Sequence, residues 1–247
     1  MNIPPQNMEI ESIYAQILNG SYRSIALTSS SANEGVTSIA FALAQRNLLA
    51  GHSTLFVDLN LHHPSLSCQL KLGQSKSDIS GMAYESLLPS PEIVSPKVVS
   101  HGNADTVITG VTNPNSRDAI IKLRKPGVLE ECIKEWQMHF DTIIIDTSPV
   151  NRVNASNIPA ERVASACDGC ILVVLANQTT EPMISETAKK LLTANAKLLG
   201  CVINDRENPP LHKELIREID RLPRFLDKHA IKLRRWVNNN LLLALNI

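Results

Sequence analysis

The chain has 247 residues, of which 43% are hydrophobic and 19% charged, and its 24 basic and 24 acidic residues give a formal net charge of +0. A chain of this length and composition buries one sizeable core, and the lack of a basic excess argues against a nucleic-acid-binding protein. The sequence has no apolar run of about 18 residues, and its start, MNIPPQNMEIES, has no basic region followed by an apolar stretch. We therefore expect a cytoplasmic protein without a membrane span or a signal peptide.

Short apolar runs of strand length alternate along the chain with segments of helical periodicity. Within these runs both the odd-numbered and the even-numbered positions are apolar, which is typical of strands that are covered on both faces. The strand candidates are 24–30, 53–59, 105–111, 141–148, 170–176 and 197–205, and the helical segments are 37–52, 124–140 and 181–196. This alternation predicts an α/β fold in a single domain, with a mostly parallel sheet and helices on both faces. Residues 84–103, with three prolines, are expected to form a mobile loop.

The stretch SSSANEGVTS, from Ser29 to Ser38, resembles a phosphate-binding loop of the pattern G-x-x-x-x-G-K-[ST]. It lies between a predicted strand and a predicted helix, whose N-terminal N–H groups and partial positive charge attract anions. Valine occupies the lysine position, so the backbone can contact phosphate but no side-chain cation can. Thr37 stands at the position of the Mg²⁺-binding hydroxyl, although an ordinary helix-start threonine is an equally good interpretation. The candidate nucleotide-binding residues are Ser30, Asn33, Glu34, Gly35, Val36, Thr37 and Ser38.

Two aspartates follow apolar strands and complete a candidate magnesium site. Asp58 lies near the end of strand 53–59, and Asp146 lies near the end of strand 141–148 and precedes Thr-Ser-Pro, as in a Walker B motif. Because the carboxyl ends of parallel strands meet at one edge, both carboxylates should face the phosphate loop. A single aspartate at a strand end is usually a turn residue. Three phosphate-site elements in the correct order favour a Mg²⁺ site of Thr37, Asp58 and Asp146.

With these segments the chain resembles the bacterial tyrosine kinases (BY-kinases), the ATPases of capsule and exopolysaccharide export within the MinD/ParA-like group of P-loop proteins. The family patterns TSxxPGEGKST, LLIDxDxRxPxL and FDxVIIDTPPV are matched by TSSSANEGVTS, LFVDLNLHHPSL and FDTIIIDTSPV. The resemblance covers residues 9–205 and includes the segments NPNSRDAIIKLRKPGVLEECIKEW, CDGCILVVLANQTT and LLGCVIND. It implies that Asp58 activates the acceptor hydroxyl, that Asp146 is the Walker B acid and that Asn204 contacts adenine.

The chain departs from the family pattern at several site positions. Val36 replaces lysine, Asn33 a glycine, Asn60 an acid and His62 an arginine. Loss of one charge at a transferring phosphate commonly costs a factor of about 100 or more in rate, whereas binding through backbone N–H groups and Mg²⁺ suffers less. We therefore expect weak or absent binding of ATP, ADP and Mg²⁺, and impaired or absent ATPase and kinase activity. A cation from elsewhere would change this expectation, and the candidates are a partner or the side chains of Arg46, Lys71 and Lys76.

Tyrosines and the N-terminal segment also differ from the family. BY-kinases autophosphorylate a C-terminal tyrosine cluster, whereas the tyrosines here are Tyr14, Tyr22 and Tyr84. The family's ring assembly uses arginines of an N-terminal helix, and EIESIYAQIL contains none. Autokinase activity of the family type therefore has no evident acceptor, and self-association stays open.

The tail is expected to form two helices divided by Pro223, with eight Lys/Arg and four acids between Leu211 and Arg235. Such a basic amphipathic segment can contact an anionic membrane surface, but a solvated surface helix is the favoured interpretation because the acids dilute the charge. The predicted organisation is an N-terminal helix or arm (1–22), a P-loop-like α/β domain (23–210) and a C-terminal basic helical segment (211–247).

Taken together, the sequence predicts a degenerate BY-kinase-like protein, a pseudo-ATPase or pseudokinase at the inner face of the inner membrane. It would act as an accessory or regulatory partner of an inner-membrane polysaccharide co-polymerase or export protein. Two alternatives stand beside this hypothesis. One is an active ATPase or tyrosine kinase of polysaccharide export, and the other is a MinD-like membrane-associated positioning ATPase.

Overall fold

The computed structural model describes residues 3–18, 22–63, 93–94, 99–101, 104–106, 109–111, 114, 117–152, 154, 157–206, 211–221 and 227–239. The chain divides into two compact units. The first, here called the sheet unit, comprises Met1–Val174 and Thr179–Asn204, and the second, the C-terminal unit, comprises Leu175–Gln178 and Asp205–Ile247. None of the described helices is both long enough and apolar enough to cross a membrane.

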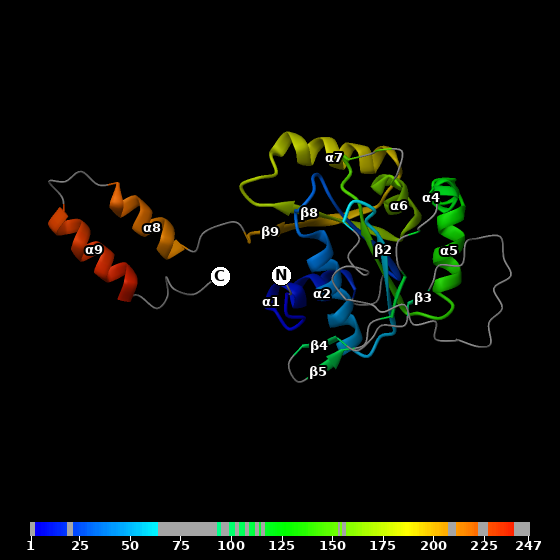
Figure 1. Ribbon diagram of the computed structural model, residues 1–247, viewed down its shortest axis with the longest axis horizontal. Coiled ribbons are helices and arrows are strands. Elements are labelled where there is room, and N and C mark those ends of the chain that lie inside the picture. The colour runs from blue at the N-terminus through cyan, green and yellow to red at the C-terminus, as the bar shows by residue number, and fades with distance from the viewer. Residues whose placement is uncertain are drawn as a thin grey trace. The chain divides into compact units, whose positions relative to one another are not determined.

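A seven-stranded sheet with the order β3-β6-β2-β7-β1-β8-β9 organises the fold (Figure 1). Strand β2 pairs in parallel with β6 and β7, and β1 pairs in parallel with β7 and β8, whereas β3 is antiparallel to β6. The strands are β1 (Ser24–Ser29), β2 (Thr54–Leu59), β3 (Ile93–Val94), β6 (Thr109–Val111), β7 (Thr142–Thr147), β8 (Gly169–Leu175) and β9 (Leu198–Asn204). The prediction of a mostly parallel α/β sheet is confirmed.

One predicted strand, 105–111, is divided in the structure. Its first part belongs to β5 (Ala104–Thr106), which pairs antiparallel with β4 (Val99–His101) in a separate two-stranded sheet, and its second part is β6. Strands β4 and β5 are neighbours in the chain, and such neighbours readily pair with each other as a local antiparallel ladder. The expected loop 84–103 contains the short strands β3 and β4, and its other residues lie outside the described ones.

The sheet unit has helices α1 (Met8–Ile17), α2 (Val36–Leu49), α4 (Arg117–Leu123), α5 (Val128–Trp136), α6 (Ala160–Ala166) and α7 (Glu181–Thr193). The three predicted helical segments appear as α2, α5 and α7. Helices α4 and α6 are not among the predicted segments, and the short, small-residue sequence AERVASA of α6 has too few large apolar residues to show a helical period. The C-terminal unit contains α8 (Leu211–Asp220) and α9 (Asp227–Asn239), the expected pair of helices, while Pro223 lies outside the described residues.

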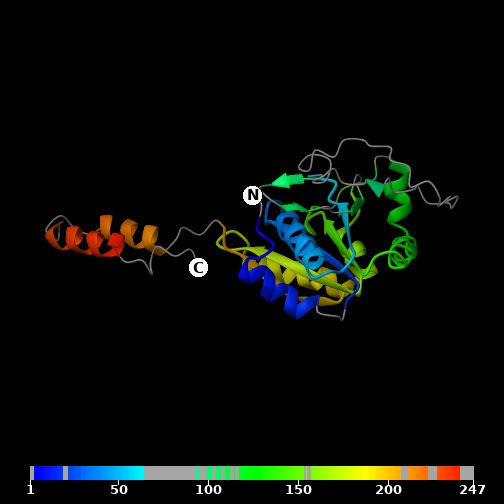
Figure 2. The same ribbon diagram turned by 90° about the horizontal axis from the view of Figure 1, so that it is seen from below.

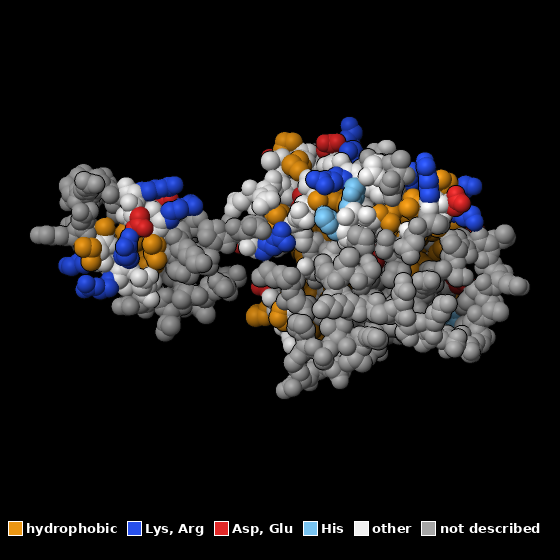
Figure 3. Space-filling model, viewed as in Figure 1, with side chains coloured by type: hydrophobic (Ala, Val, Ile, Leu, Met, Phe, Trp, Pro, Cys, Tyr) orange, Lys and Arg blue, Asp and Glu red, His pale blue; other side chains and the backbone are white. Residues whose placement is uncertain are grey.

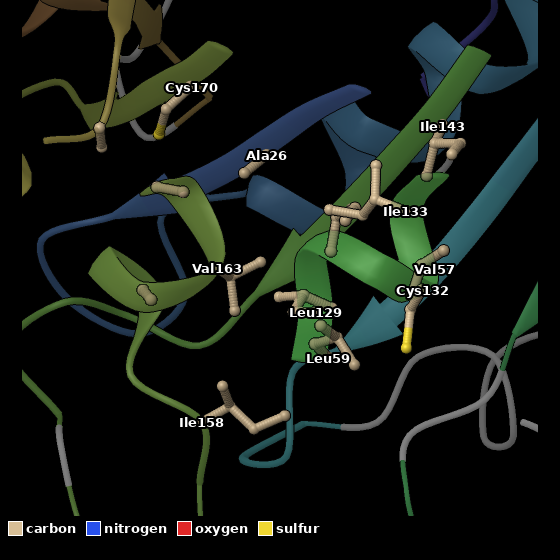
Figure 4. Close-up of a cluster of buried hydrophobic side chains, with 14 of the residues drawn as sticks. Ala26, Val57, Leu59, Leu129, Cys132, Ile133, Ile143, Ile158, Val163 and Cys170 are labelled. Carbon is tan, nitrogen blue, oxygen red and sulfur yellow. The ribbon is translucent and has the colours of Figure 1, made fainter. Parts of the chain in front are cut away.

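Alternation of side chains along the strands builds one core on each face of the sheet. On one face, residues of β1, β2 and β7 pack against α5, α6 and α7, and Figure 4 shows part of this cluster, including Ala26, Val57, Ile143, Leu129, Ile133 and Val163. On the other face, residues of the same strands pack against α1 and α2, including Ile25, Leu27, Phe56, Ile144, Ile10 and Leu43. Figure 2 shows α1 (dark blue) alongside α2 (lighter blue). The prediction of helices on both faces is therefore confirmed.

Candidate functional site

The phosphate-loop candidate joins the end of β1 at Ser29 to the start of α2 at Val36. Two residues of the loop adopt left-handed backbone conformations, Asn33 with φ 67° and Gly35 with φ 95°. A Cβ atom on Gly35 would lie 2.2 Å from Nδ2 of Asn204, so a larger residue here would need both a strained backbone angle and a shift of the Asn204 side chain. The strand, loop and helix arrangement thus follows the prediction for this segment.

The buried carboxylate of Glu34 fixes the shape of the loop from inside. It accepts hydrogen bonds from the backbone N–H groups of Ser30 and Ser31, both at 3.1 Å, and from the hydroxyl of Thr179 at 2.9 Å. Burial raises the pKa of Glu34, and these three hydrogen bonds partly offset the rise. Asn204 donates through Nδ2 to the carbonyl of Glu34 at 2.8 Å, so the predicted adenine contact lies directly against the loop.

Polar side chains also tie the start of the loop to α7. Thr187 of α7 donates to the hydroxyl of Ser30 at 2.9 Å, and Ser30 is fully buried. The N–H of Ser30 is bound to Glu34, so the polar groups of this predicted nucleotide-binding residue are engaged within the protein. Thr179 and Thr187 could not be predicted as contacts of the loop, because no local pattern reports contacts between residues 145 and 157 positions apart.

The first turn of α2 lacks the cation of a typical phosphate loop. Val36 is buried, with 7% of its surface exposed, and its side chain packs in the core of the α1–α2 face. The N–H groups of Val36, Thr37 and Ser38 lie in the first turn, where they have no partner within the helix. Arg46, one of the cations considered from the sequence, lies in the last turn of α2 and binds Glu11 at 2.5 Å, while Lys71 and Lys76 lie outside the described residues.

The two aspartates face each other at the carboxyl edge of adjacent strands. In the parallel pairing of β2 with β7, Asp58 is the register partner of Asp146, and both side chains are fully buried. The hydroxyl of Thr37 donates to Oδ2 of Asp146 at 2.5 Å. The three predicted magnesium residues are therefore brought together by the fold.

Electrostatics at this edge favour a bound cation. Burial, and next the charge of Asp58, raise the pKa of Asp146 well above its usual value, and the side chains of Thr37 and Asn60 offset part of the rise. The buried Oδ1 of Asp146 accepts no hydrogen bond within the described part of the chain. Two buried carboxylates with one unsatisfied oxygen and a hydroxyl are the oxygen ligands that Mg²⁺ prefers. The residues of this site therefore fit a magnesium ion.

The segment after β2 turns over the acid pair. The N–H of Asn60 donates to Oδ1 of Asp58 at 3.0 Å, and the N–H of His63 donates to Oδ1 of Asn60 at 3.3 Å. Nε2 of His62 lies 3.0 Å from the carbonyl oxygen of Arg152. The two histidines therefore lie in the loop that follows β2 and take part in its hydrogen bonds.

Comparison with known proteins supports the resemblance in sequence. The chain is 27% identical to the tyrosine-protein kinase CpsD of Streptococcus pneumoniae over 196 residues, which cover 76% of this chain and 78% of that protein. It is 24% identical to the tyrosine-protein kinase YwqD of Bacillus subtilis over 202 residues, which cover 81% and 78%. No protein-family model matches the chain.

Solved structures show the same fold. The kinase domain of VpsO matches with a TM-score of 0.59 and 22% identity, over 78% of this chain and 90% of that one. Cobyrinic acid a,c-diamide synthase from Mycobacterium smegmatis, with a bound ATP analogue and magnesium, matches with a TM-score of 0.55 and 18% identity, over 88% and 93%. The chain therefore has a P-loop NTPase-like fold and resembles the BY-kinases.

Proposed function

We propose that this chain is a degenerate BY-kinase-like protein that binds a magnesium nucleotide weakly and acts as an accessory, regulatory component of capsule or exopolysaccharide synthesis and export. The observation that carries the proposal is the combination found at one edge of the sheet. Asp58 and Asp146 are register partners and Thr37 donates to Asp146, which supports a magnesium site, whereas the lysine position holds the buried Val36. Such a site retains groups for binding and lacks a group for catalysis.

Binding would rest on the backbone and on the acids. The N–H groups of Asn33, Glu34, Gly35, Val36, Thr37 and Ser38 would contact the phosphates, while Glu34 and Ser30 hold the loop in shape. Thr37 and Asp146 would hold Mg²⁺ with Asp58, and Asn204 would contact the base from its place against the loop. The ion would supply positive charge beside the phosphate oxygens when it is bound.

Catalysis would be weak, because the charge that stabilises a transferring phosphoryl group is missing from α2. Groups of this kind contribute several kcal/mol each, so the loss of one costs a factor of about 100 or more in rate. The described tyrosines are also poor acceptors. Arg46 lies over the ring of Tyr14 at 4.3 Å, and Lys197 lies over the ring of Tyr22 at 4.8 Å. Both rings pack against the core of the α1–α2 face rather than in a tail.

The partner class we propose is an inner-membrane polysaccharide co-polymerase or export protein, which the chain would meet at the cytoplasmic face. The relatives named as tyrosine kinases support this assignment to polysaccharide export, through the family that they represent. Ring assembly of the family type is not favoured. Helix α1 carries no arginine, and the carboxylate of its Glu11 is bound to Arg46 of the same chain.

Calorimetric titration of the purified chain with ATP and with ADP, in the presence and absence of Mg²⁺, tests the proposal. We expect Mg²⁺-dependent binding, together with turnover that is at least about 100-fold below that of an active relative measured in parallel. Absence of binding at millimolar nucleotide would show that the loop is structural and would overturn the nucleotide-binding part. Turnover comparable to the relative would favour the alternative of an active ATPase or kinase.

A lysine at position 36 tests whether weak catalysis is due to the missing lysine alone or to changes at several positions of the site. Val36→Lys should increase ATP turnover if the acids and Thr37 are intact. Val36→Met, which has a long apolar side chain without a charge, controls for the change in size at this buried position. An equal effect of both variants would show that charge is not the missing element.

The third candidate, a membrane-associated positioning ATPase, is favoured by one feature of the C-terminal unit. Helix α9 exposes Ile231, Leu233 and Trp236, with 56%, 45% and 57% of their surfaces accessible, among lysine and arginine residues. Such a helix can lie on an anionic membrane surface. Co-sedimentation of the full chain with anionic vesicles, but not with neutral ones, would support this candidate, and failure to pellet would remove it.

A further inference from the structure

The segment that follows β7 brings one arginine to the edge of the sheet that carries the acid pair. The N–H of Val150 donates to the carbonyl of Ser29 at 2.9 Å, and the N–H of Asn151 donates to the carbonyl of Ser30 at 3.3 Å. These bonds extend the pairing of β7 with β1 beyond the strand ends, up to the start of the phosphate loop. Arg152 is therefore the next residue after a segment that is hydrogen-bonded to the loop.

The backbone of Arg152 is held on both sides. Its N–H donates to the carbonyl of Pro149 at 3.1 Å, and its own carbonyl accepts from Nδ2 of Asn157 at 2.7 Å and lies 3.0 Å from Nε2 of His62. His62 follows the strand of Asp58, and Arg152 follows the strand of Asp146. Arg152 thus has a fixed position between the ends of the two strands that carry the acids.

The side chain of Arg152 differs from the other arginines of the sheet unit that have structural roles. Arg23 binds the carbonyls of Gln137 and Phe140, Arg46 binds Glu11, Arg124 binds the carbonyls of Asn154 and Asn157, and Arg162 binds Glu130. Arg152 is exposed, and within the described ranges its guanidinium has no hydrogen bond or ion pair. Figure 3 shows basic and histidine side chains next to each other on one face of the sheet unit. A guanidinium on a fixed backbone, without a partner among the described residues, is suited to an external anion.

We propose that Arg152 binds the terminal phosphate of a nucleoside triphosphate held by the loop, and so supplies from the β7 side the positive charge that Val36 does not. This inference rests on the proposed nucleotide binding. A guanidinium can bind two phosphate oxygens at once, and arginines supplied from another segment perform this task in other phosphate sites. Its place beyond Asp146, rather than at the start of α2, favours contact with the last phosphate over the first two.

Binding measurements with charge-removing and charge-keeping variants test this role. We expect Arg152→Gln to raise the dissociation constant for Mg²⁺-ATP about tenfold or more and that for ADP much less, with an unchanged melting temperature. Arg152→Lys should keep part of the affinity. The matched control is Arg117→Gln, which removes an exposed arginine of α4 and should leave binding as in the unaltered chain. Equal affinities of the Arg152→Gln variant and the unaltered chain would overturn the proposal.

A double-mutant cycle with the loop adds a readout that a structural role would not change. If both cations serve the same phosphate, Arg152→Gln should weaken ATP binding less in a Val36→Lys background than in the unaltered chain. Fully additive effects would contradict the shared role.

Inorganic tripolyphosphate with Mg²⁺ distinguishes failure of this inference from failure of the proposed function. If nucleotide does not bind but tripolyphosphate binds in an Arg152-dependent way, the phosphate site stands and nucleotide recognition is refuted. If nucleotide binds without dependence on Arg152, the proposed function stands and this inference is refuted. Absence of binding by both ligands refutes both.

Discussion

At the scale of single residues, the free energy of the site is dominated by the burial of two carboxylates and next by the repulsion between their charges. An acid whose pKa is raised in the folded chain binds its proton more tightly there than in the unfolded chain. The free energy of unfolding therefore falls as the pH rises from the unfolded pKa of Asp146, about 4, through the higher folded pKa, and is level above it. At neutral pH the two buried carboxylates therefore lower the free energy of unfolding. A bound cation would raise it again.

Removal of this charge should stabilise the protein. We expect Asp146→Asn to raise the free energy of unfolding at pH 7 by about 1 kcal/mol or more, or the melting temperature by about 2–4 °C, because an amide oxygen can still accept from Thr37. The same variant should lose Mg²⁺-dependent binding. Thermal unfolding at several pH values measures both the gain and its disappearance in acid.

Asp141 provides a control of opposite sign. Its carboxylate accepts from the N–H and the hydroxyl of Ser53, and these bonds lower its pKa. A lowered pKa contributes stability above the unfolded pKa that is lost in acid, so Asp141→Asn should lower the melting temperature at pH 7. A lower melting temperature for Asp146→Asn at pH 7 would contradict the proposed destabilisation by the buried charge of Asp146.

Glu34 is the residue on which the shape of the loop depends. Glu34→Ala would leave the buried N–H groups of Ser30 and Ser31 without their acceptor, and we expect a loss of about 1–3 kcal/mol in the free energy of unfolding. Glu34→Gln keeps one acceptor oxygen and should lose less. Urea unfolding of both variants measures the difference, and equal losses would show that the hydrogen bonds do not hold the loop.

At the scale of elements, the junction between the loop and α2 depends on a close approach of β9. The side chain of Asn204, the last residue of β9, occupies the space next to Gly35. This contact couples the geometry of the loop to an edge strand of the sheet. The loop is therefore a tertiary feature as much as a local turn.

Two glycines with similar backbone angles separate these contributions. Gly35 and Gly51 have φ of 95° and 88°, but a Cβ on Gly51 would meet no atom within 4 Å. Both Gly→Ala variants should lose about 1–2 kcal/mol of the free energy of unfolding, because alanine is strained in the left-handed backbone conformation. Gly35→Ala should lose at least about 1 kcal/mol more, because Asn204 must move. Chemical denaturation measures the loss in the free energy of unfolding for both variants. Equal losses would mean that the side chain of Asn204 moves aside without a cost.

At the scale of the whole molecule, both hydrophobic cores are built from the sheet unit. Their members lie between Ile3 and Val202, and the described side chains of α8 and α9 are not among them. Burial of these two clusters is the main source of folding free energy for a domain of this size. The sheet unit should therefore fold without the tail.

Truncation after residue 206 tests this expectation. We expect residues 1–206 to unfold cooperatively, with a melting temperature within about 5 °C of the full chain. Truncation after residue 193 is the control, since it also removes β9 with Leu198 and Val202, which pack against the two cores. It should be strongly destabilised. Aggregation or non-cooperative melting of the longer fragment would show that the tail contributes to the core.

The sequence by itself determined which residues end which strand. The apolar runs before Asp58 and Asp146, and the small polar residues before α2, are local patterns, and the rule that parallel strands share one carboxyl edge is enough to gather them. For this reason the fold class and the loop, together with Thr37 and the acid pair, could be predicted. The division of the predicted strand 105–111 between two sheets could not be predicted, because the alternation of its side chains is the same whether a residue pairs in the two-stranded or in the seven-stranded sheet.

Only the tertiary structure decided how these groups meet. The pairing of β2 with β7 sets Asp58 in register with Asp146, Thr179 donates to the buried Glu34, and Arg152 is carried to the edge by the bonds of Val150 and Asn151 to Ser29 and Ser30. These contacts join segments that are about 90 to 145 positions apart in the chain. Local periodicity fixes which face or end a residue occupies, whereas contact between distant segments depends on strand order and packing, which no local pattern encodes.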